Sequence, residues 1–293
     1  MKPIFLAVLM ASTSHAALAA DAVFESDPVP APVVEETRFS LTLGGGVGFQ
    51  PLYEGSDEYR TVGFPIVSPS FGASDGPRRF EFRGLDDVRI HALYAGGLSV
   101  GPLLGYRFGR DQDDSRRLNG LGDIDGGLVV GGFVNYDVIS EGPERLGVGL
   151  AYSTQVTGDA ADGSVLPALS NDYGYEIDLS AHYETQVTDR LNVAMRAGGT
   201  YADDDYMQTH FGVDPLQAAN SAAAGVGLLA YDADAGIKNV YANVSTVYQL
   251  TQNFDLRAGL GYSRLLNDAA DSPVTENENQ FNGFLGAAYK LQF

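Results

Sequence analysis

From residue 38 onward the chain is built of short stretches in which apolar residues alternate with polar or small ones. Residues 173–184 show the pattern most clearly, because Tyr, Ile, Leu and Ala fill the odd-numbered positions while Gly, Glu, Asp, Ser and His fill the even-numbered ones. Successive side chains of a β-strand point to opposite faces. The stretch therefore predicts a strand with one apolar face and one polar face.

Stretches of this kind predict about twelve strands, with ten as the alternative count. They are residues 38–50, 61–71, 79–82, 88–94, 99–110, 127–138, 145–154, 173–184, 191–201, 237–250, 254–265 and 281–293. The second contains Pro65 and Pro69, and proline cannot donate a hydrogen bond to a strand ladder. We therefore expect the second strand to be weak or bulged.

The connections between these strands alternate in length. Those after even-numbered strands are short (72–77, 95–98, 140–144, 188–190 and 251–253), whereas most of those after odd-numbered strands are longer and rich in Asp, Asn and Gly (51–60, 111–125, 158–172, 202–236 and 267–279). Short periplasmic turns and longer extracellular loops are typical of outer-membrane barrels, whereas a soluble β-sandwich has no reason to alternate. The fold prediction is an all-β, transmembrane, antiparallel up-and-down β-barrel.

The last stretch carries a second sign of this class. Leu285, Ala287, Tyr289, Leu291 and Phe293 share one face of the predicted terminal strand. Apolar or aromatic residues at the last, third-last and fifth-last positions resemble the assembly signal of bacterial outer-membrane barrels, here Tyr289, Leu291 and Phe293. The barrel-assembly machinery is therefore an expected partner; the alternative is an ordinary edge strand of a soluble sandwich.

The first 37 residues predict export. Lys2, an apolar run too short to span a bilayer and an A-x-A site at residues 17–19 predict a signal peptide over residues 1–20, cleaved after Ala19 or Ala20. Residues 21–37 are acidic and hold three prolines, which favours an extended periplasmic linker before a barrel over residues 38–293. The expected location is the outer membrane of a Gram-negative bacterium.

Composition narrows the function. The net charge is −20, with 38 acidic against 18 basic residues, and this argues against nucleic-acid binding. Cysteine is absent, which argues against a disulfide scaffold. Outer-membrane lipid and lipopolysaccharide are the expected surroundings, and acidic loops that meet lipopolysaccharide through bridging divalent cations are one hypothesis.

With the apolar faces toward lipid, charged residues of both signs line the predicted lumen. The lumen-facing polar set is Arg107, Glu176, Asp178, His182, Glu184, Arg196 and Arg257. Charges in a narrow space usually pair, because an unpaired charge there costs on the order of several kcal/mol. Two interpretations stay open: a salt-bridged structural interior, or a narrow pore for small solutes.

Signals of catalysis are weak. Only His91, His182 and His210 follow the signal peptide, and none has the spacing of a known nucleophile motif, although Ser221 could approach His210 in the long loop. Acidic runs at residues 203–205 and at 111, 113 and 114 could hold Ca²⁺, but such runs are usually solvated. We expect no enzyme, no cofactor and no metal site.

Four motifs occur in order: YEGSDEYR (53–60), GR…DSRRLNGL (109–121), YMQTHFGVDPLQAANS (206–221) and DAADSPV (268–274). Together with the terminal LQF they resemble the MipA/OmpV family of MltA-interacting outer-membrane proteins. The motif residues in the loops are Tyr53, Glu54, Gly55, Ser56, Asp57, Tyr59, Arg60, Asp114, Ser115, Leu118, Gly120, Leu121, Phe211, Gly212, Val213, Asp271, Ser272 and Pro273.

The resemblance implies a non-enzymatic scaffold that bridges a lytic transglycosylase and a peptidoglycan synthase. Other family members are described as osmoregulated proteins, adhesins or modulators of antibiotic susceptibility, so a surface adhesin acting through residues 202–236, or a stress-responsive envelope protein, stays an alternative. A lipid-modifying enzyme is the least favoured alternative.

The motifs fall mostly in the predicted outer loops, away from the periplasmic side where murein enzymes dock. Their alternative role is to pack those loops. Apolar contacts would come from Tyr53, Tyr59, Phe211 and Pro273, and turn or cap hydrogen bonds from Asp114, Ser115 and Ser272.

Overall fold

The computed structural model describes residues 39–71, 80–83, 87–140, 143–157 and 173–292. The expected signal peptide (1–20) and linker (21–37), the predicted turn at 72–77 and the predicted loop at 158–172 lie outside the described residues, as does Phe293.

The described residues form thirteen strands of one antiparallel sheet. They are β1 (Phe39–Pro51), β2 (Tyr59–Phe71), β3 (Phe80–Phe82), β4 (Val88–Ile90), β5 (Leu93–Ala95), β6 (Leu98–Arg107), β7 (Gly127–Ile139), β8 (Glu144–Gln155), β9 (Tyr175–Thr188), β10 (Leu191–Ala202), β11 (Gly236–Gln249), β12 (Phe254–Leu265) and β13 (Asn279–Gln292). Twelve of them follow one another in the hydrogen-bonded order β2-β1-β13-β12-β11-β10-β9-β8-β7-β6-β4-β3, and β5 pairs with β6 beside this path. The predicted up-and-down arrangement of about twelve strands is confirmed.

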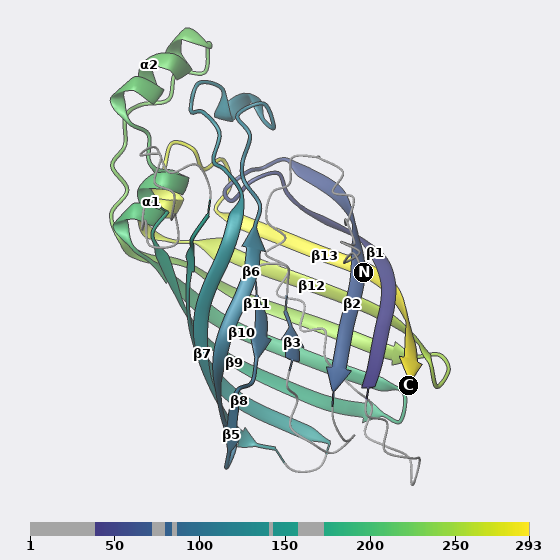
Figure 1. Cartoon of the computed structure of the whole chain (residues 1–293). Helices are drawn as coiled ribbons and strands as arrows, with labels where there is room; N and C mark the ends of the chain where they lie inside the picture. The colour runs from purple at the N-terminus through teal and green to yellow at the C-terminus, as the bar shows by residue number, and fades with distance from the viewer. Residues whose placement is uncertain (1–38, 72–79, 84–86, 141–142, 158–172, 293) are drawn as a thin grey trace, which may run out of the picture.

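The sheet curls around a central lumen (Figure 1). The last strand, β13, lies between β12 and the first strand, β1. The register of β1 and β13 runs without interruption from the pair Ser40–Gln292 to the pair Phe49–Gly283. Within the part of the chain that the structure describes, no strand pairing joins β2 to β3, the two ends of the hydrogen-bonded order. We call the curled sheet the barrel wall.

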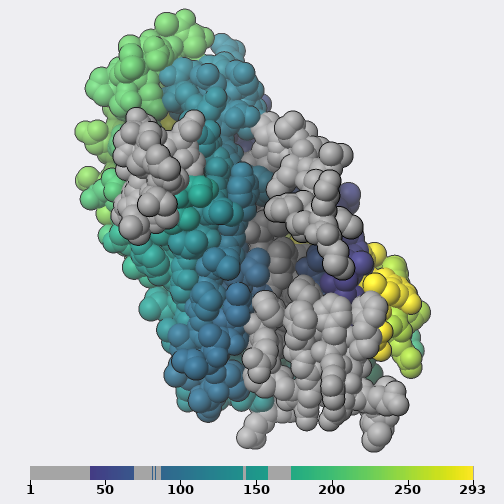
Figure 2. Space-filling view, viewed as in Figure 1, coloured from purple at the N-terminus to yellow at the C-terminus, as the bar shows by residue number. Residues whose placement is uncertain are grey.

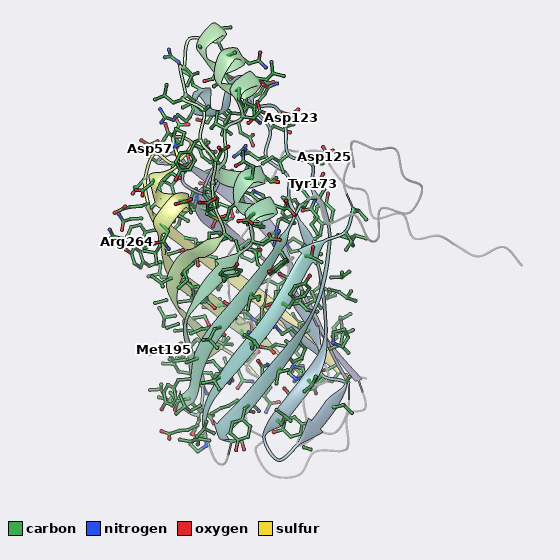
Figure 3. The ribbon with its side chains drawn as sticks, turned by 90° about the vertical axis from the view of Figure 1, so that its left-hand side faces the viewer. Asp57, Asp123, Asp125, Tyr173, Met195 and Arg264 are labelled. Atoms are coloured by element: carbon green, nitrogen blue, oxygen red, sulfur yellow. The ribbon has the colours of Figure 1, made fainter. Side chains whose placement is uncertain are left out.

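The outer face of the barrel wall is apolar, as the alternation predicts, and the inner face carries charged residues together with a small apolar cluster of Leu103, Val129, Phe133 and Ala151. Leu285, Leu260 and Leu179 are 65%, 63% and 63% exposed. On the opposite face, Arg107 and Arg196 are buried. Figure 3 shows Met195 pointing away from the wall. A surface of this kind suits lipid outside and a polar lumen inside.

Two local predictions about the strands are wrong. The segment with Pro65 and Pro69 forms β2, which pairs with β1 in one continuous register. It lies at the end of the sheet, and proline is tolerated in an edge strand because one side of that backbone needs no ladder partner. Residues 88–94, expected as one strand, are split into β4 and β5 around His91 and Ala92.

The two ends of the barrel differ, as the connection lengths predict. At one end the strands are joined by short turns, such as residues 96–97, 189–190 and 250–253 (the turn end; bottom of Figure 1). At the other end the connections 52–58, 108–126, 203–235 and 266–278 fold together, and we call them the loop cap (top of Figure 1). The loop end of an outer-membrane barrel faces the exterior.

The loop cap contains four short helices that the strand analysis did not predict: η1 (Arg116–Leu118), α1 (Asp204–Phe211), α2 (Pro215–Ala223) and α3 (Asn267–Asp271). Figure 2 shows α2 and the loop around η1 standing beyond the strands. Asp203 caps α1 by accepting from Tyr206 N, and Asp214 forms a capping box with Gln217. Asp214-Pro215 with Gln217 three positions on is a helix-start signal in the sequence.

No helix in the described ranges has the length and apolar character needed to cross a membrane.

The loop cap has an apolar core of its own. Phe211, Met207 and Tyr206 of α1 pack with Leu265 and Ala269. A second cluster draws on all four connections and comprises Tyr53, Leu118, Leu121, Val213, Leu228 and Val274, each at most 5% exposed. The loop cap is therefore a folded unit seated on the outer mouth of the lumen.

Candidate functional site: a cavity beneath the loop cap

A cavity of about 250 Å³ lies where the loop cap meets the lumen. The wall contributes charged residues from β6, β9, β10 and β11, and the cap contributes Tyr53, Glu54, Arg110, Tyr206 and His210. Most of the charged groups that line it are buried or half-buried. Both the wall and the loop cap thus contribute charged groups to the cavity.

Lys238 joins wall and cap at this place. Its Nζ donates to Glu176 Oε1 at 2.6 Å and to the hydroxyl oxygen of Tyr206 at 3.1 Å, and lies 3.0 Å from Glu54 Oε1. Arg107 pairs with the other oxygen of Glu176. A buried charge is tolerated when it is paired and hydrogen-bonded, and these residues satisfy that requirement together. The network fastens α1 and the first loop onto the wall.

The aromatic face of Tyr206 adds a second kind of contact. The guanidinium of Arg107 lies 5.0 Å from the ring centroid, and Lys238 Nζ lies 4.6 Å from it. Both distances are in the range of cation–π attraction. Burial, together with the charge of Glu176, raises the pKa of Tyr206 above its usual range, so the hydroxyl stays protonated.

Two further ion pairs line the wall side of the cavity. Arg196 donates to Asp178 Oδ1 at 2.6 Å and to Ser180 Oγ at 3.0 Å, while Tyr241 donates to the other oxygen of Asp178 at 2.6 Å. Arg89 donates to both oxygens of Asp87, its Nε lying 2.8 Å from Oδ1. The wall therefore pairs its own charges.

Sequence reasoning missed Lys238. Strict alternation in β11 assigns even-numbered residues to the lipid face, as it correctly does for Val240 and Val244. Thr200 pairs with Asn239 and Tyr201 with Ile237, so Lys238 is the extra residue of a β-bulge. A bulge re-aims side chains, and here both Lys238 and Asn239 are buried. No feature of the sequence marks the bulge.

The structure separates the lumen-facing residues that the sequence singled out. Arg107, Glu176, Asp178 and Arg196 line the cavity beneath the loop cap. His182 and Glu184 line a smaller cavity of about 50 Å³ farther along the lumen. Arg257 lies elsewhere, with its Nε 2.9 Å from Asp255 Oδ1.

The smaller cavity holds a Ser–His–Glu chain that sequence reasoning also missed. His91 Nδ1 lies 3.0 Å from Ser99 Oγ, and His91 Nε2 lies 3.1 Å from Glu81 Oε2. His182 Nε2 lies 3.1 Å from Asp137 Oδ1 in the same cavity. Ser99 is 4% exposed and lines this cavity.

The Ser–His contact considered in the long loop does not form. Ser221 is buried and its Oγ accepts from Leu228 N at 3.1 Å. His210 lies in α1, and its Nε2 has no hydrogen-bond partner.

Most motif residues of the four loops meet in the loop cap. Tyr59 and Arg60, expected in the first loop, lie instead at the start of β2, and Tyr59 is exposed. The Tyr53 hydroxyl donates to Val274 O at 3.1 Å, and Arg117 Nε donates to Pro273 O at 2.9 Å. Ser272 Oγ donates to Phe211 O, and Ser115 caps η1. Burial raises the pKa of Tyr53 above its usual range, with Glu276 adding to the effect.

Backbone contacts complete the loop cap. The Gly55 oxygen accepts from Glu276 N and Asn277 N, and Gln280 Nε2 donates to Ser56 O. Gly120 has a φ of +92°, and a Cβ there would lie 2.5 Å from Ser221 N, so α2 packs on this loop only because residue 120 is glycine.

The remaining motif residues take other places. Val213 forms a two-hydrogen-bond bridge with Tyr231, and Gly212 ends α1. Leu118 and Leu121 lie in the cap core, and Glu54 pairs with Lys238. Exposed members are Asp57, Tyr59 and Asp271, while Arg60 and Asp114 are half-buried. Figure 3 places Asp57 at the loop end of the molecule.

The acidic run at residues 203–205 serves the fold. Asp203 accepts from Tyr175 N at 2.8 Å as well as from Tyr206 N, and Asp204 accepts from Ala235 N at 2.6 Å. Among the residues that the structure describes, no group of three or more His, Asp or Glu side chains is arranged to hold a metal ion.

Comparison with known proteins decides the family. The family model described as MltA-interacting protein MipA matches residues 43–291. The chain belongs to the MipA family. This confirms the resemblance found in the loop motifs, and the match covers most of the chain. The MipA-family chain is an outer-membrane protein with a β-barrel fold.

Among curated relatives, the outer membrane protein YiaT of Escherichia coli K12 is 24% identical over 141 residues. These residues are 48% of this chain and 54% of YiaT. YiaT of Escherichia coli O157:H7 matches with the same identity and coverage. The chain thus spans about half the length of the curated relatives it matches. Solved structures with similarity include OmpT of Vibrio cholerae (11% identity, 86% of this chain, 97% of that chain, TM-score 0.42) and the COG4313 outer-membrane channel of Pseudomonas putida F1 (12% identity, 91% and 100%, TM-score 0.44).

Proposed function

We propose that this MipA-family barrel is a non-enzymatic scaffold that holds peptidoglycan-remodelling enzymes, a lytic transglycosylase and a peptidoglycan synthase, at the inner side of the outer membrane. The observation that carries the proposal is the loop cap, which is fixed to the wall through Lys238, Glu176 and Glu54. A barrel whose mouth is filled by a packed lid suits a fixed platform. The description of the matching family as MltA-interacting also supports this partner class.

The loop motifs no longer conflict with a scaffold role. Tyr53, Leu118, Val213 and Val274 are cap-core residues, so packing accounts for their presence in the outer loops. Docking is then assigned to the turn end, on the opposite side of the barrel. β1 begins at the turn end with Phe39.

The non-enzymatic part of the proposal is supported by the surroundings of the one Ser–His contact described. Ser99 is buried against His91 in a cavity of about 50 Å³. A nucleophile needs room for a substrate carbonyl and for oxyanion donors beside it. We assign Ser99, His91 and Glu81 a structural role inside the wall.

Binding of a purified lytic transglycosylase to the refolded protein in nanodiscs tests the proposal. Exchanging the exposed turn-end charges, Asp189→Lys with Arg190→Glu, and separately deleting residues 21–37 should weaken binding. Asp57→Lys, an equally exposed charge change at the loop end, is the matched control and should leave binding unchanged. Absence of binding by the unmodified protein, or equal loss in the control, would refute the scaffold.

A pore for small solutes is the second candidate, favoured by the polar cavity in the lumen. Single-channel recording in a planar bilayer tests it. Stable conducting steps that change when Arg107 or Arg196 is replaced would support the pore. A correctly folded barrel that conducts no ions would favour the scaffold function over the pore.

A further inference from the structure

Arg110 differs from the other cations of the cavity beneath the loop cap. Lys238 and Arg107 share Glu176, Arg196 pairs with Asp178, and Arg89 pairs with Asp87. Arg110 is 8% exposed and forms no ion pair with any residue in the described ranges. Its side chain donates to the carbonyl oxygen of His210 at 3.0 Å, and its Nε has no hydrogen-bond partner.

A buried, unpaired guanidinium is costly for a fold to keep. Burial lowers the pKa of Arg110 to about 10, which still leaves the group cationic at neutral pH. The packing of the loop cap therefore encloses a positive charge without supplying a carboxylate for it. Enclosed charges of this kind are typical of ligand sites.

The backbone holds Arg110 in place. Its N–H donates to Ile124 O at 2.8 Å, and Ile124 N donates back to Arg110 O at 2.8 Å. A Cβ at Gly109 would lie 2.1 Å from Ile124 O. The two segments of this loop can therefore approach each other so closely only because residue 109 is glycine. The backbone of Arg110 is thus fixed by Ile124, and the His210 carbonyl holds the guanidinium.

His210 supplies a second unsatisfied group on the same cavity. Its Nε2 has no hydrogen-bond partner, and the centroids of the His210 and Tyr206 rings lie 4.3 Å apart. Burial and the positive charges of Arg107, Arg110 and Lys238 lower the pKa of His210 well below its usual range, against the smaller opposing effect of Glu176. The potential around His210 is therefore positive.

We propose that the cavity beneath the loop cap binds a small oxyanion, the carboxylate or phosphate group of a solute, on the guanidinium of Arg110 and the imidazole of His210. A guanidinium matches the planar fork of a carboxylate or phosphate and forms charge-assisted hydrogen bonds with it. The volume of about 250 Å³ limits the ligand to a small molecule. The buried Asn239 Oδ1, which also has no partner, offers an acceptor to a hydroxyl or ammonium group of the same solute.

This site is independent of the scaffold function, and calorimetric titration of the refolded protein tests it. The probes are inorganic phosphate and acetate, each as its sodium salt, with choline chloride as a cation control at matched ionic strength. Comparing phosphate with acetate shows which oxyanion the cavity prefers. Saturable binding of at least one oxyanion and none of choline is expected.

Arg110→Gln should weaken oxyanion binding about tenfold or more, because it removes the charge-assisted hydrogen bonds. Arg110→Lys keeps the charge and should retain part of the affinity. Arg116→Gln is the matched control, since it removes an exposed arginine from the same loop, and it should bind as the unmodified protein does. Heat-modifiable migration on gels verifies that each variant has folded.

Absence of saturable binding, or equal loss in Arg110→Gln and Arg116→Gln, would overturn the site. Should Arg110→Gln fail to fold, NMR titration of His210 in the unmodified protein decides. An anion beside the imidazole stabilises its protonated form, so phosphate or acetate should raise the pKa of His210. A His210 titration that the anions leave unchanged would overturn the proposal.

Discussion

In the loop cap the least exposed side chains are mostly apolar, whereas in the barrel wall they include several arginines. Phe211 and Val213 are fully buried in the cap, while Arg107 and Arg196 are buried in the wall and Leu260 is 63% exposed. One chain thus follows opposite patterns in two regions because the two regions face different solvents. Water surrounds the cap, and lipid surrounds the wall.

Removing the largest apolar side chain of the cap core should show the cap to be a separate unit. Phe211→Ala should destabilise the cap by about 4 kcal/mol, because it deletes a fully buried aromatic ring. Limited proteolysis should then cut within residues 203–235 while the barrel keeps its heat-modifiable migration. Leu216→Ala, at a 68% exposed position, is the control and should not raise cleavage. Loss of the whole barrel in Phe211→Ala would show that cap and wall unfold together.

An arginine placed at two equally exposed leucines should separate the two solvents. Leu260→Arg, near the middle of β12, should cost roughly 3 kcal/mol, because it puts a charge into the hydrocarbon region. Leu216→Arg on α2 should change stability little, because water already surrounds that side chain. Reversible unfolding in urea with lipid vesicles measures both values. Equal costs would mean that the two leucines do not face different solvents.

The smallest expected effect concerns the start of α1. Asp203→Ala removes an acceptor for both Tyr206 N and Tyr175 N and should cost about 1 kcal/mol of cap stability. Asp205→Ala changes an exposed residue in the first turn of the same helix and should cost only about 0.3 kcal/mol of cap stability. Amide hydrogen exchange of residues 204–211 measures the difference. Similar exchange in both variants would assign the capping role elsewhere.

The barrel wall was predictable because its solvent imposes a period of two along each strand. Strand positions, the apolar faces and the contrast between short turns and long loops all follow from that period, as in β9 and β12. The prediction of a weak or bulged second strand failed because β2 is an edge strand, and an edge strand tolerates Pro65. The split between β4 and β5 breaks the period locally, so the sequence indicated one strand where the structure has two.

The candidate site was less accessible to sequence reasoning. Arg107, Glu176, Asp178 and Arg196 were found because they occupy inward positions of regular strands. Lys238 was missed because a β-bulge turns an outward position inward. Arg110 was missed because the sequence placed it at the end of a predicted strand, residues 99–110, whereas β6 ends at Arg107 and Arg110 belongs to the loop cap. Its lack of an ion-pair partner among the described residues depends on contacts among several loops.

The pairing of β1 with β13 sets the order in which this protein can fold. Ser40 pairs with Gln292, 252 positions later in the chain, and β13 is the neighbour that holds the β1–β2 hairpin to the rest of the sheet. Contacts this distant in sequence give a high contact order, and they form slowly because a large loop must close first. The first strands to leave the ribosome must therefore stay unpaired on that edge until the last strand has been made, which suits a chain that folds only after transport.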